Sequence, residues 1–131
     1  MITNGSCACG SIKYQIEGEL SKATHCHCNH CRQTSGAPFI TWIEVKSSDF
    51  KLLQGEPGSF ESRENVARQF CTQCGTQLTY QHAKRLDYVD VTVGSLNDPG
   101  AVVPNQHIWC DRMLDWLELN DGLPQYGMNR T

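Results

Sequence analysis

Eight cysteines in a chain of 131 residues dominate the chemistry that this sequence can perform. They form a C-x-C pair, a C-x-C-x-x-C triplet, a C-x-x-C pair and one single residue, at Cys7/Cys9, Cys26/Cys28/Cys31, Cys71/Cys74 and Cys110. Cysteines two residues apart are poor disulfide partners for each other, but they can direct two thiolates toward one ion. The spacing therefore favours metal binding, with zinc as the expected metal, over a disulfide framework.

The compartment inferred from the sequence agrees with metal binding. Disulfide frameworks belong to oxidising compartments, and the start MITNGSCACG has neither the basic nor the apolar region of a secretion signal. We therefore expect a cytoplasmic location. No apolar run approaches the ~20 residues that span a bilayer, so no membrane association is expected. The net charge of -3 and the pI near 5.9 argue against nucleic acid as a partner.

The coordination number of zinc divides the cysteines into one closed site and one open site. Structural zinc takes four protein ligands, and catalytic zinc takes about three and keeps one exchangeable position. The two pairs, Cys7 with Cys9 and Cys71 with Cys74, supply four thiolates and predict a structural zinc site. In CACG and CTQCG each pair is followed by a glycine, which suits a tight turn whose backbone N–H groups face the sulfurs.

The triplet Cys26, Cys28 and Cys31 in HCHCNHC predicts the open site, because three thiolates leave zinc one ligand short. A thiol that fills this position loses its proton and becomes a nucleophile at neutral pH. Cys110 or His30 as a fourth ligand remains an alternative that would close the site. Strand alternation directs His25 and His27 away from Cys26 and Cys28, so His27 and His30 are considered instead as acids near the reaction.

Short strands are the elements expected to position these cysteines. The strand signals are alternation, β-branched residues and aromatics, and they occur at 12–16, 39–45, 50–53, 66–70, 77–80, 88–96, 102–109 and, as a short or edge strand, 115–119. A single helical turn is expected within 31–38, ended by Gly36 and Pro38. No linker divides the chain, so we expect one mostly β domain over residues 1–131.

The order of these motifs resembles one known family. The segments GSCACGSIKYQI, HCHCNHCRQTSGAPF, RQFCTQCGTQL and HIWCDRMLDWLELNDGLPQY are similar to those of the glutathione-dependent formaldehyde-activating enzyme family, which includes centromere protein V-like domains. The resemblance implies a small antiparallel β-tent fold stapled by zinc. It also implies a structural zinc on Cys7, Cys9, Cys71 and Cys74 and a catalytic zinc on Cys26, Cys28 and Cys31.

The resemblance further implies a carbon–sulfur lyase whose small thiol substrate is glutathione, which adds to formaldehyde to give S-hydroxymethylglutathione. Arg32 to Ser35 are considered as ligands for a substrate carboxylate, and Phe39, Trp42 and Trp109 as pocket or core residues. Two other functions stay open: a non-catalytic zinc-stabilised binding module, and redox sensing or metal storage by the exposed triplet.

Overall fold

The computed structural model describes residues 1–20 and 22–129 and is built mostly from β-strands. Its strands are β1 (Ile2–Ser6), β2 (Lys13–Glu17), β3 (Ala23–Cys26), β4 (Ile40–Lys46), β5 (Phe50–Gln54), β6 (Gly58–Arg63), β7 (Val66–Phe70), β8 (Gln77–His82), β9 (Tyr88–Thr92) and β10 (Gln106–Ile108). The helices are short: α1 (Asn29–Ser35) and the 3₁₀ turns η1 (Ser47–Asp49), η2 (Val93–Ser95), η3 (Pro99–Ala101) and η4 (Cys110–Arg112).

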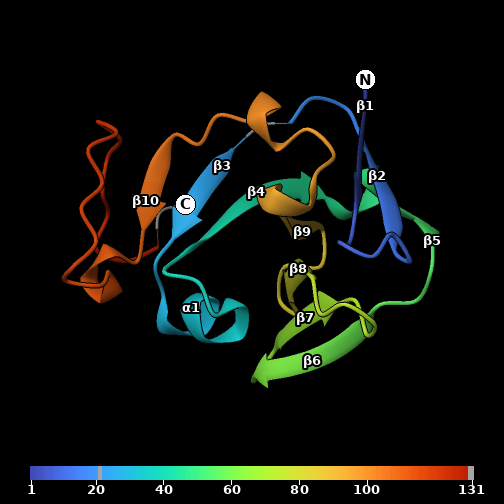
Figure 1. The fold of residues 1–131 in the computed structure, drawn as a ribbon, viewed down its shortest axis with the longest axis horizontal. Helices are drawn as coiled ribbons and strands as arrows, with labels where there is room; N and C mark the ends of the chain where they lie inside the picture. The colour runs from blue at the N-terminus through green and yellow to red at the C-terminus, as the bar shows by residue number, and fades with distance from the viewer. Residues whose placement is uncertain (21, 130–131) are drawn as a thin grey trace.

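The strands form two sheets; in Figure 1 the smaller sheet lies at the right, and the larger sheet runs from the left through the centre to the lower right. The smaller sheet has the order β1-β2-β5, and the larger sheet has the order β10-β3-β4-β9-β8-β7-β6. Every neighbouring pair is antiparallel except β10 and β3, which run parallel. The mostly β, antiparallel class expected from the sequence is therefore confirmed, with one parallel pair added at the edge of the larger sheet.

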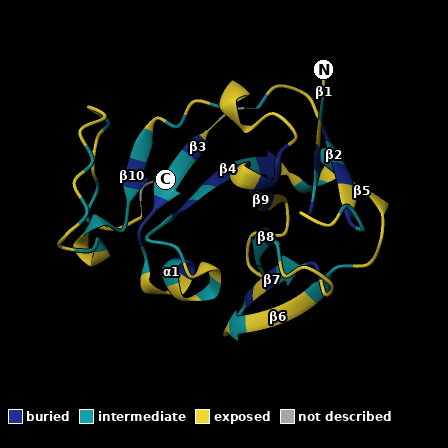
Figure 2. Ribbon diagram, viewed as in Figure 1, coloured by how far each residue is buried: buried dark blue, intermediate teal, exposed yellow. Residues whose placement is uncertain are grey.

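The main hydrophobic core lies between the smaller sheet and one face of the larger sheet. Alternation along β4 shows how the sequence creates this face: Ile43 and Val45 are buried in the core, whereas Trp42 and Glu44 point to the opposite side. Tyr14 of β2 is fully buried in the same core, and its hydroxyl lies 2.6 Å from Ser95 Oγ. Figure 2 shows the resulting burial of β4 beside the mostly exposed β6.

Most predicted strands appear in the structure with shifted ends. The prediction over 66–70 coincides with β7, and 88–96 contains β9 followed by η2. The helical turn expected within 31–38 is α1, and Gly36 ends it with a left-handed φ of 69°. The suggested strand over 115–119 is wrong, because the chain makes a turn there in which Leu117 N donates to Leu114 O, and Trp116 is 69% exposed.

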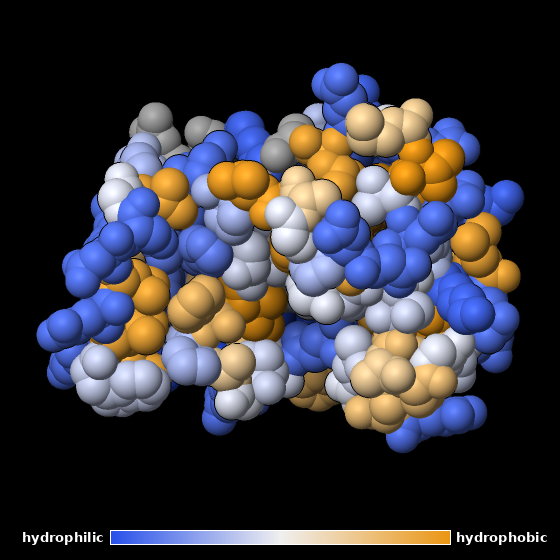
Figure 3. All heavy atoms as spheres, turned by 45° about the horizontal axis from the view of Figure 1, so that its top comes forward, coloured by the Kyte–Doolittle hydropathy of each residue, from blue (hydrophilic) through white to orange (hydrophobic). Residues whose placement is uncertain are grey.

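The surface mixes hydrophilic and hydrophobic residues, and the face drawn in Figure 3 shows the hydrophobic ones in scattered groups. Within the described part of the chain, no helix is both long and apolar enough to span a membrane.

Candidate metal centres and a charged cleft

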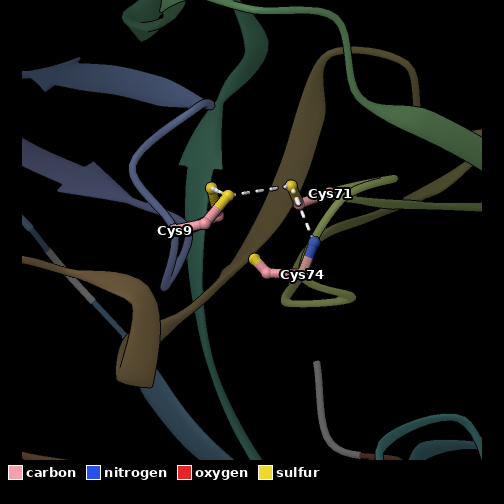
Figure 4. Close-up of side chains that lie close together, drawn as sticks. Cys9, Cys71 and Cys74 are labelled. Atoms are coloured by element: carbon pink, nitrogen blue, oxygen red, sulfur yellow. Dashed lines mark hydrogen bonds between the residues drawn. The ribbon is translucent and has the colours of Figure 1, made fainter.

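The first candidate metal centre joins two turns that lie far apart in the sequence. Cys7 and Cys9 follow β1, and Cys71 and Cys74 lie between β7 and β8. All four Sγ atoms lie within 4.8 Å of one another, with Cys7 3.6 Å from Cys9 and Cys9 3.7 Å from Cys71. Figure 4 shows the sulfurs of Cys9, Cys71 and Cys74 converging. Sulfurs arranged tetrahedrally around zinc lie about 3.8 Å apart, given a Zn–S distance of about 2.3 Å, so this donor set fits zinc.

The two turns have the same local construction, as the similar C-x-C-G and C-x-x-C-G sequences predict. Gly10 N donates to Cys7 O, and Gly75 N donates to Cys71 O. Both glycines have positive φ, 82° and 79°, which a residue with a side chain rarely adopts. Backbone N–H groups also face the sulfurs: Ile12 N lies 3.2 Å from Cys7 Sγ, and Cys74 N lies 3.4 Å from Cys71 Sγ. These donors stabilise negative charge on the sulfurs.

The pKa values favour the thiolate form at two of these four cysteines, Cys74 and Cys7, whereas the pKa of Cys9 is raised. Hydrogen bonding to the Thr76 hydroxyl and backbone lowers the pKa of Cys74 from 9.0 to about 5. For Cys7, burial raises the pKa, but hydrogen bonds from Ile12 N–H and Ser11 outweigh it and bring the pKa to about 7. Because zinc binds the thiolate and not the thiol, both residues are prepared for metal.

The second candidate centre is the triplet, whose three Sγ atoms also lie within 4.8 Å of one another. Cys26 ends β3, Cys28 caps the N-terminus of α1, and Cys31 lies in its first turn. Cys28 Sγ accepts a hydrogen bond from Cys31 N at 3.3 Å, and the sulfurs of Cys31 and Cys26 are 3.4 Å apart. A strand end followed at once by a capped helix therefore brings three closely spaced cysteines to one point.

The pKa values of these three thiols indicate that one of them, Cys28, ionises readily while its neighbour Cys26 does not. Hydrogen bonds from Cys26 and Cys31 lower the pKa of Cys28 to about 2. Hydrogen bonds to Cys28 and Cys31, together with burial, raise the pKa of Cys26. Like charges this close oppose each other's ionisation, so three thiolates need a cation among them. The donor set thus fits zinc and offers it only three protein sulfurs.

The triplet faces a cleft of about 660 Å³, to which Cys26, Cys28 and Cys31 all contribute. The cleft lies on the face of the larger sheet opposite the main core. Its charges are mainly positive, with five lysine or arginine side chains against two acidic ones: Lys22, Arg63, Arg68, Lys84, Arg85, Glu44 and Asp90. A chain with net charge -3 therefore presents a basic surface beside its three-cysteine site.

The other residues considered from the sequence take different positions. His30, Trp42 and Trp109 line the cleft, and Trp42 Nε1 donates to Cys31 Sγ at 3.4 Å. Arg32 lies in α1, where its side chain contacts Asn29 instead of the cleft. Cys110 lies in η4 and belongs to neither sulfur cluster of the described residues.

His25 and His27 lie behind the triplet, as alternation predicts, and they pack against Phe39. His27 is fully buried, and its Nε2 lies 2.9 Å from Nδ1 of His107, whose Nε2 in turn lies 2.7 Å from Asp121 Oδ2. Burial, followed by the nearby His107 and His25, lowers the pKa of His27 to about 4. His27 is thus part of a buried hydrogen-bonded chain, not a cleft acid.

Sequence reasoning missed three residues of these surroundings: Arg68, His107 and Asp121. Arg68 lies in the cleft wall, and its Nη2 is 3.9 Å from Cys31 Sγ. His25, His107 and Asp121 also have ligand atoms within 4.8 Å of one another, but both nitrogens of His107 already have hydrogen-bonding partners. His107 contacts His27 across 80 residues of sequence and Asp121 across 14, and no spacing pattern indicates either contact. In the sequence, Arg68 stood out only as a charged residue inside the strand predicted over 66–70, which does not indicate a position beside the cysteines.

The fold and these clusters define a small, mostly β protein with two cysteine sets that can hold metal, one of which faces a cleft. The family model described as glutathione-dependent formaldehyde-activating enzyme matches residues 2–112. The chain belongs to this family, as the resemblance of its cysteine motifs indicates.

Two individual proteins are similar to this chain. An uncharacterized lyase of Schizosaccharomyces pombe is 28% identical over 78 residues, which are 60% of this chain and 56% of that protein. The chain thus spans little more than half the length of that relative. The crystal structure of a Rhodobacter sphaeroides protein matches with a TM-score of 0.57 and 19% identity, over 93% of this chain and 98% of that chain; this supports the fold alone.

Proposed function

We propose that the chain is a zinc-dependent carbon–sulfur lyase that forms or cleaves a thiol adduct of the S-hydroxymethylglutathione type. The observation that carries this proposal is the difference between the two sulfur clusters. Cys7, Cys9, Cys71 and Cys74 supply a complete set of four ligands away from the cleft, whereas Cys26, Cys28 and Cys31 supply three and face it. The first set suits a structural zinc and the second a catalytic zinc.

A zinc ion on the triplet would supply one free coordination position and lower the pKa of a thiol that occupies it. The protein's own residues prepare the rest of the site. The Trp42 N–H and the Arg68 guanidinium both face Cys31 Sγ and stabilise its negative charge. His30 and His82 both line the cleft, and His30, which precedes Cys31 in the sequence, is the one that we expect to exchange protons beside the triplet.

The length and charge of the cleft suit a small peptide thiol. Cys26 pairs with Ile40, and Asp90 pairs with Glu44, so four residues of β4 separate the triplet from the acidic pair. That separation is about 13 Å at about 3.3 Å per residue, similar to the roughly 10 Å of an extended tripeptide. Glutathione carries carboxylates and an ammonium group, and the cleft carries both basic and acidic side chains to meet them.

This function also gives a consistent setting for the chain. All eight cysteines are free thiols, as expected in a reducing compartment such as the cytoplasm. We propose that residues 1–131 act as one domain whose partner is a small thiol and not nucleic acid.

The proposal is tested by the rate at which glutathione and ¹³C-formaldehyde exchange with their adduct, measured by NMR above the uncatalysed rate. Cys31→Ser should reduce the catalysed rate about a hundredfold or more, since it removes a ligand from the open site. Cys110→Ser, outside both clusters, is the matched control and should keep the rate. Wild-type protein with full zinc content that leaves the uncatalysed rate unchanged would contradict the proposal.

A further inference from the structure

Arg68 is a buried cation in the wall of the cleft. It lies in β7 and is only 4% exposed. Its guanidinium carbon lies 5.1 Å from the ring centre of Tyr80 and 5.9 Å from that of Trp42. These aromatic faces hold the side chain in place and favour its positive charge. Because arginine stays protonated in proteins, the charge cannot be removed by proton loss.

No carboxylate in the described part of the chain forms an ion pair with Arg68. Its Nε donates to Ser62 Oγ at 3.2 Å, and its Nη2 makes only the long contact of 3.9 Å with Cys31 Sγ. Nη1 is buried and has no hydrogen-bond partner among the residues that the structure describes. The sulfurs of the triplet supply negative charge nearby, but an unsatisfied buried donor such as Nη1 is costly to a fold. This side chain is therefore built to meet an acceptor that is bound from outside.

The position of Arg68 indicates which acceptor this is. The guanidinium borders the cleft within reach of Cys31, so its ligand would lie directly beside the three sulfurs. A guanidinium prefers oxygen anions and binds them through paired N–H donors. The Arg63 guanidinium in the same cleft differs, because Nη2 of this more exposed residue already donates to the Tyr80 hydroxyl.

We propose that Arg68 forms an oxygen-anion site that holds the carbonyl oxygen of the substrate that accepts the thiol; this rests on the proposed function. As the substrate thiolate attacks, a sulfur electron pair forms the C–S bond, and the π pair of the C=O bond moves onto oxygen. The guanidinium N–H groups donate to the resulting alkoxide, which then takes a proton from water to give the hydroxyl. In the reverse direction the hydroxyl returns its proton and the C–S bond breaks.

Formate provides a probe of this site that requires no turnover, because it is an oxygen anion of nearly the size of formaldehyde. In zinc-loaded, ¹⁵N-labelled wild-type protein, sodium formate should shift the Arg68 Nε–Hε signal saturably, whereas sodium chloride at equal ionic strength should not. Arg68→Met keeps a side chain of similar length, and no carboxylate loses an ion-pair partner through it. This variant should bind formate at least tenfold more weakly, as measured by calorimetry. Arg63→Met, the matched cleft arginine, should bind formate like wild type.

Turnover measurements distinguish the proposed Arg68 site from the proposed lyase function on which it rests. Removing one donor to a developing oxyanion typically costs about 10²–10³ in kcat, so Arg68→Met should lose that factor with zinc content unchanged, and Arg68→Lys should recover part of it. A wild-type protein that binds formate at Arg68 but shows no adduct exchange would contradict the proposed function and leave the anion site standing. An Arg68 signal unmoved by formate overturns the site, whether or not the variants fold. So does undiminished turnover in folded Arg68→Met.

Discussion

At the scale of single residues, Asp90 shows that an acidic side chain in the cleft can lower the stability of the fold at high pH. Its cross-strand neighbours are Glu44 and Tyr80. Burial, followed by the charge of Glu44, raises the pKa of Asp90 from 3.8 to about 7, and Arg85 opposes the shift. Because the folded pKa lies above the ordinary value, folding favours the protonated carboxyl. This stabilising contribution is complete below about pH 4 and is lost as the pH rises through 7.

Asp90→Asn should therefore raise the free energy of unfolding at pH 8 and change it little at pH 4. The expected gain is about 2 kcal/mol, below the roughly 4 kcal/mol that a shift of about three pKa units would give. Urea unfolding at the two pH values measures it. Asp87→Asn, at an exposed aspartate three residues earlier, is the control and should show no such difference. An equal effect of Asp90→Asn at both pH values would show that its ionisation is not the cause.

The two cysteine clusters predict different losses when one ligand is removed. Cys74→Ser should reduce the zinc content from two ions per chain to one and lower Tm by about 10 °C or more, because the structural site ties the two sheets together. Cys31→Ser should also remove one zinc but lower Tm much less. Metal analysis and thermal unfolding test this together; a Cys31→Ser protein as unstable as Cys74→Ser would mean that both sites are structural.

Cysteine spacing predicted the two local pairs and the triplet, because ligands within one turn or one strand end are fixed locally, whereas the expectation that the two pairs meet came from the four ligands that structural zinc requires. The neighbours of the clusters were not predictable in this way. Arg68 reaches Cys31 across the sheet, and Asp121 reaches His107 from the C-terminal segment. The first contact depends on the order of strands in the sheet and the second on the path of the irregular C-terminal segment, and neither follows a readable pattern in one sequence.

At the scale of elements, close packing between β1 and β2 holds the first cysteine turn in place. Gly5 faces the Tyr14 ring, and a Cβ at this position would lie 2.2 Å from Tyr14 Cζ and 2.8 Å from Ser95 O. Tyr14 cannot move away easily because it is fully buried and its hydroxyl meets Ser95. The absence of a side chain at Gly5 is thus a condition for docking the smaller sheet, two residues before Cys7.

Gly5→Ala should destabilise the fold by about 2–3 kcal/mol, since overpacking of this kind forces neighbouring groups to shift. Gly94→Ala is a suitable control, because nothing lies within 4 Å of the added Cβ there. Chemical denaturation of both variants gives the comparison. A Gly5→Ala protein as stable as Gly94→Ala would show that the contact between Tyr14 and Gly5 is looser than described.

Strand prediction succeeded where β-branched and aromatic residues alternate, as in β4 and β7. It missed β1 and β6, whose sequences ITNGS and GSFESR are rich in glycine and serine. These strands form because neighbours in the sheet supply their hydrogen bonds, not because of local preference. The strand expected over 115–119 failed for the opposite reason. Its apolar residues gave a strand signal, but the chain forms a turn there.

At the scale of the whole molecule, the larger sheet uses its two faces for different purposes. One face packs against the smaller sheet in the main core, and the other carries the cleft with the triplet and the basic side chains. This division explains how a chain with net charge -3 presents a positive site. The sequence indicated the cysteines but not the cleft, because the residues that line it come from seven different strands, from α1 and from loops.

The most direct test of the account is the absorption spectrum of the cobalt-substituted protein before and after addition of glutathione. The account predicts that glutathione at millimolar concentration changes the thiolate-to-cobalt bands, because a fourth sulfur joins Cys26, Cys28 and Cys31. The change should persist in Cys110→Ser and disappear in Cys31→Ser. Unchanged bands in wild-type protein with both sites filled would contradict an open three-cysteine centre.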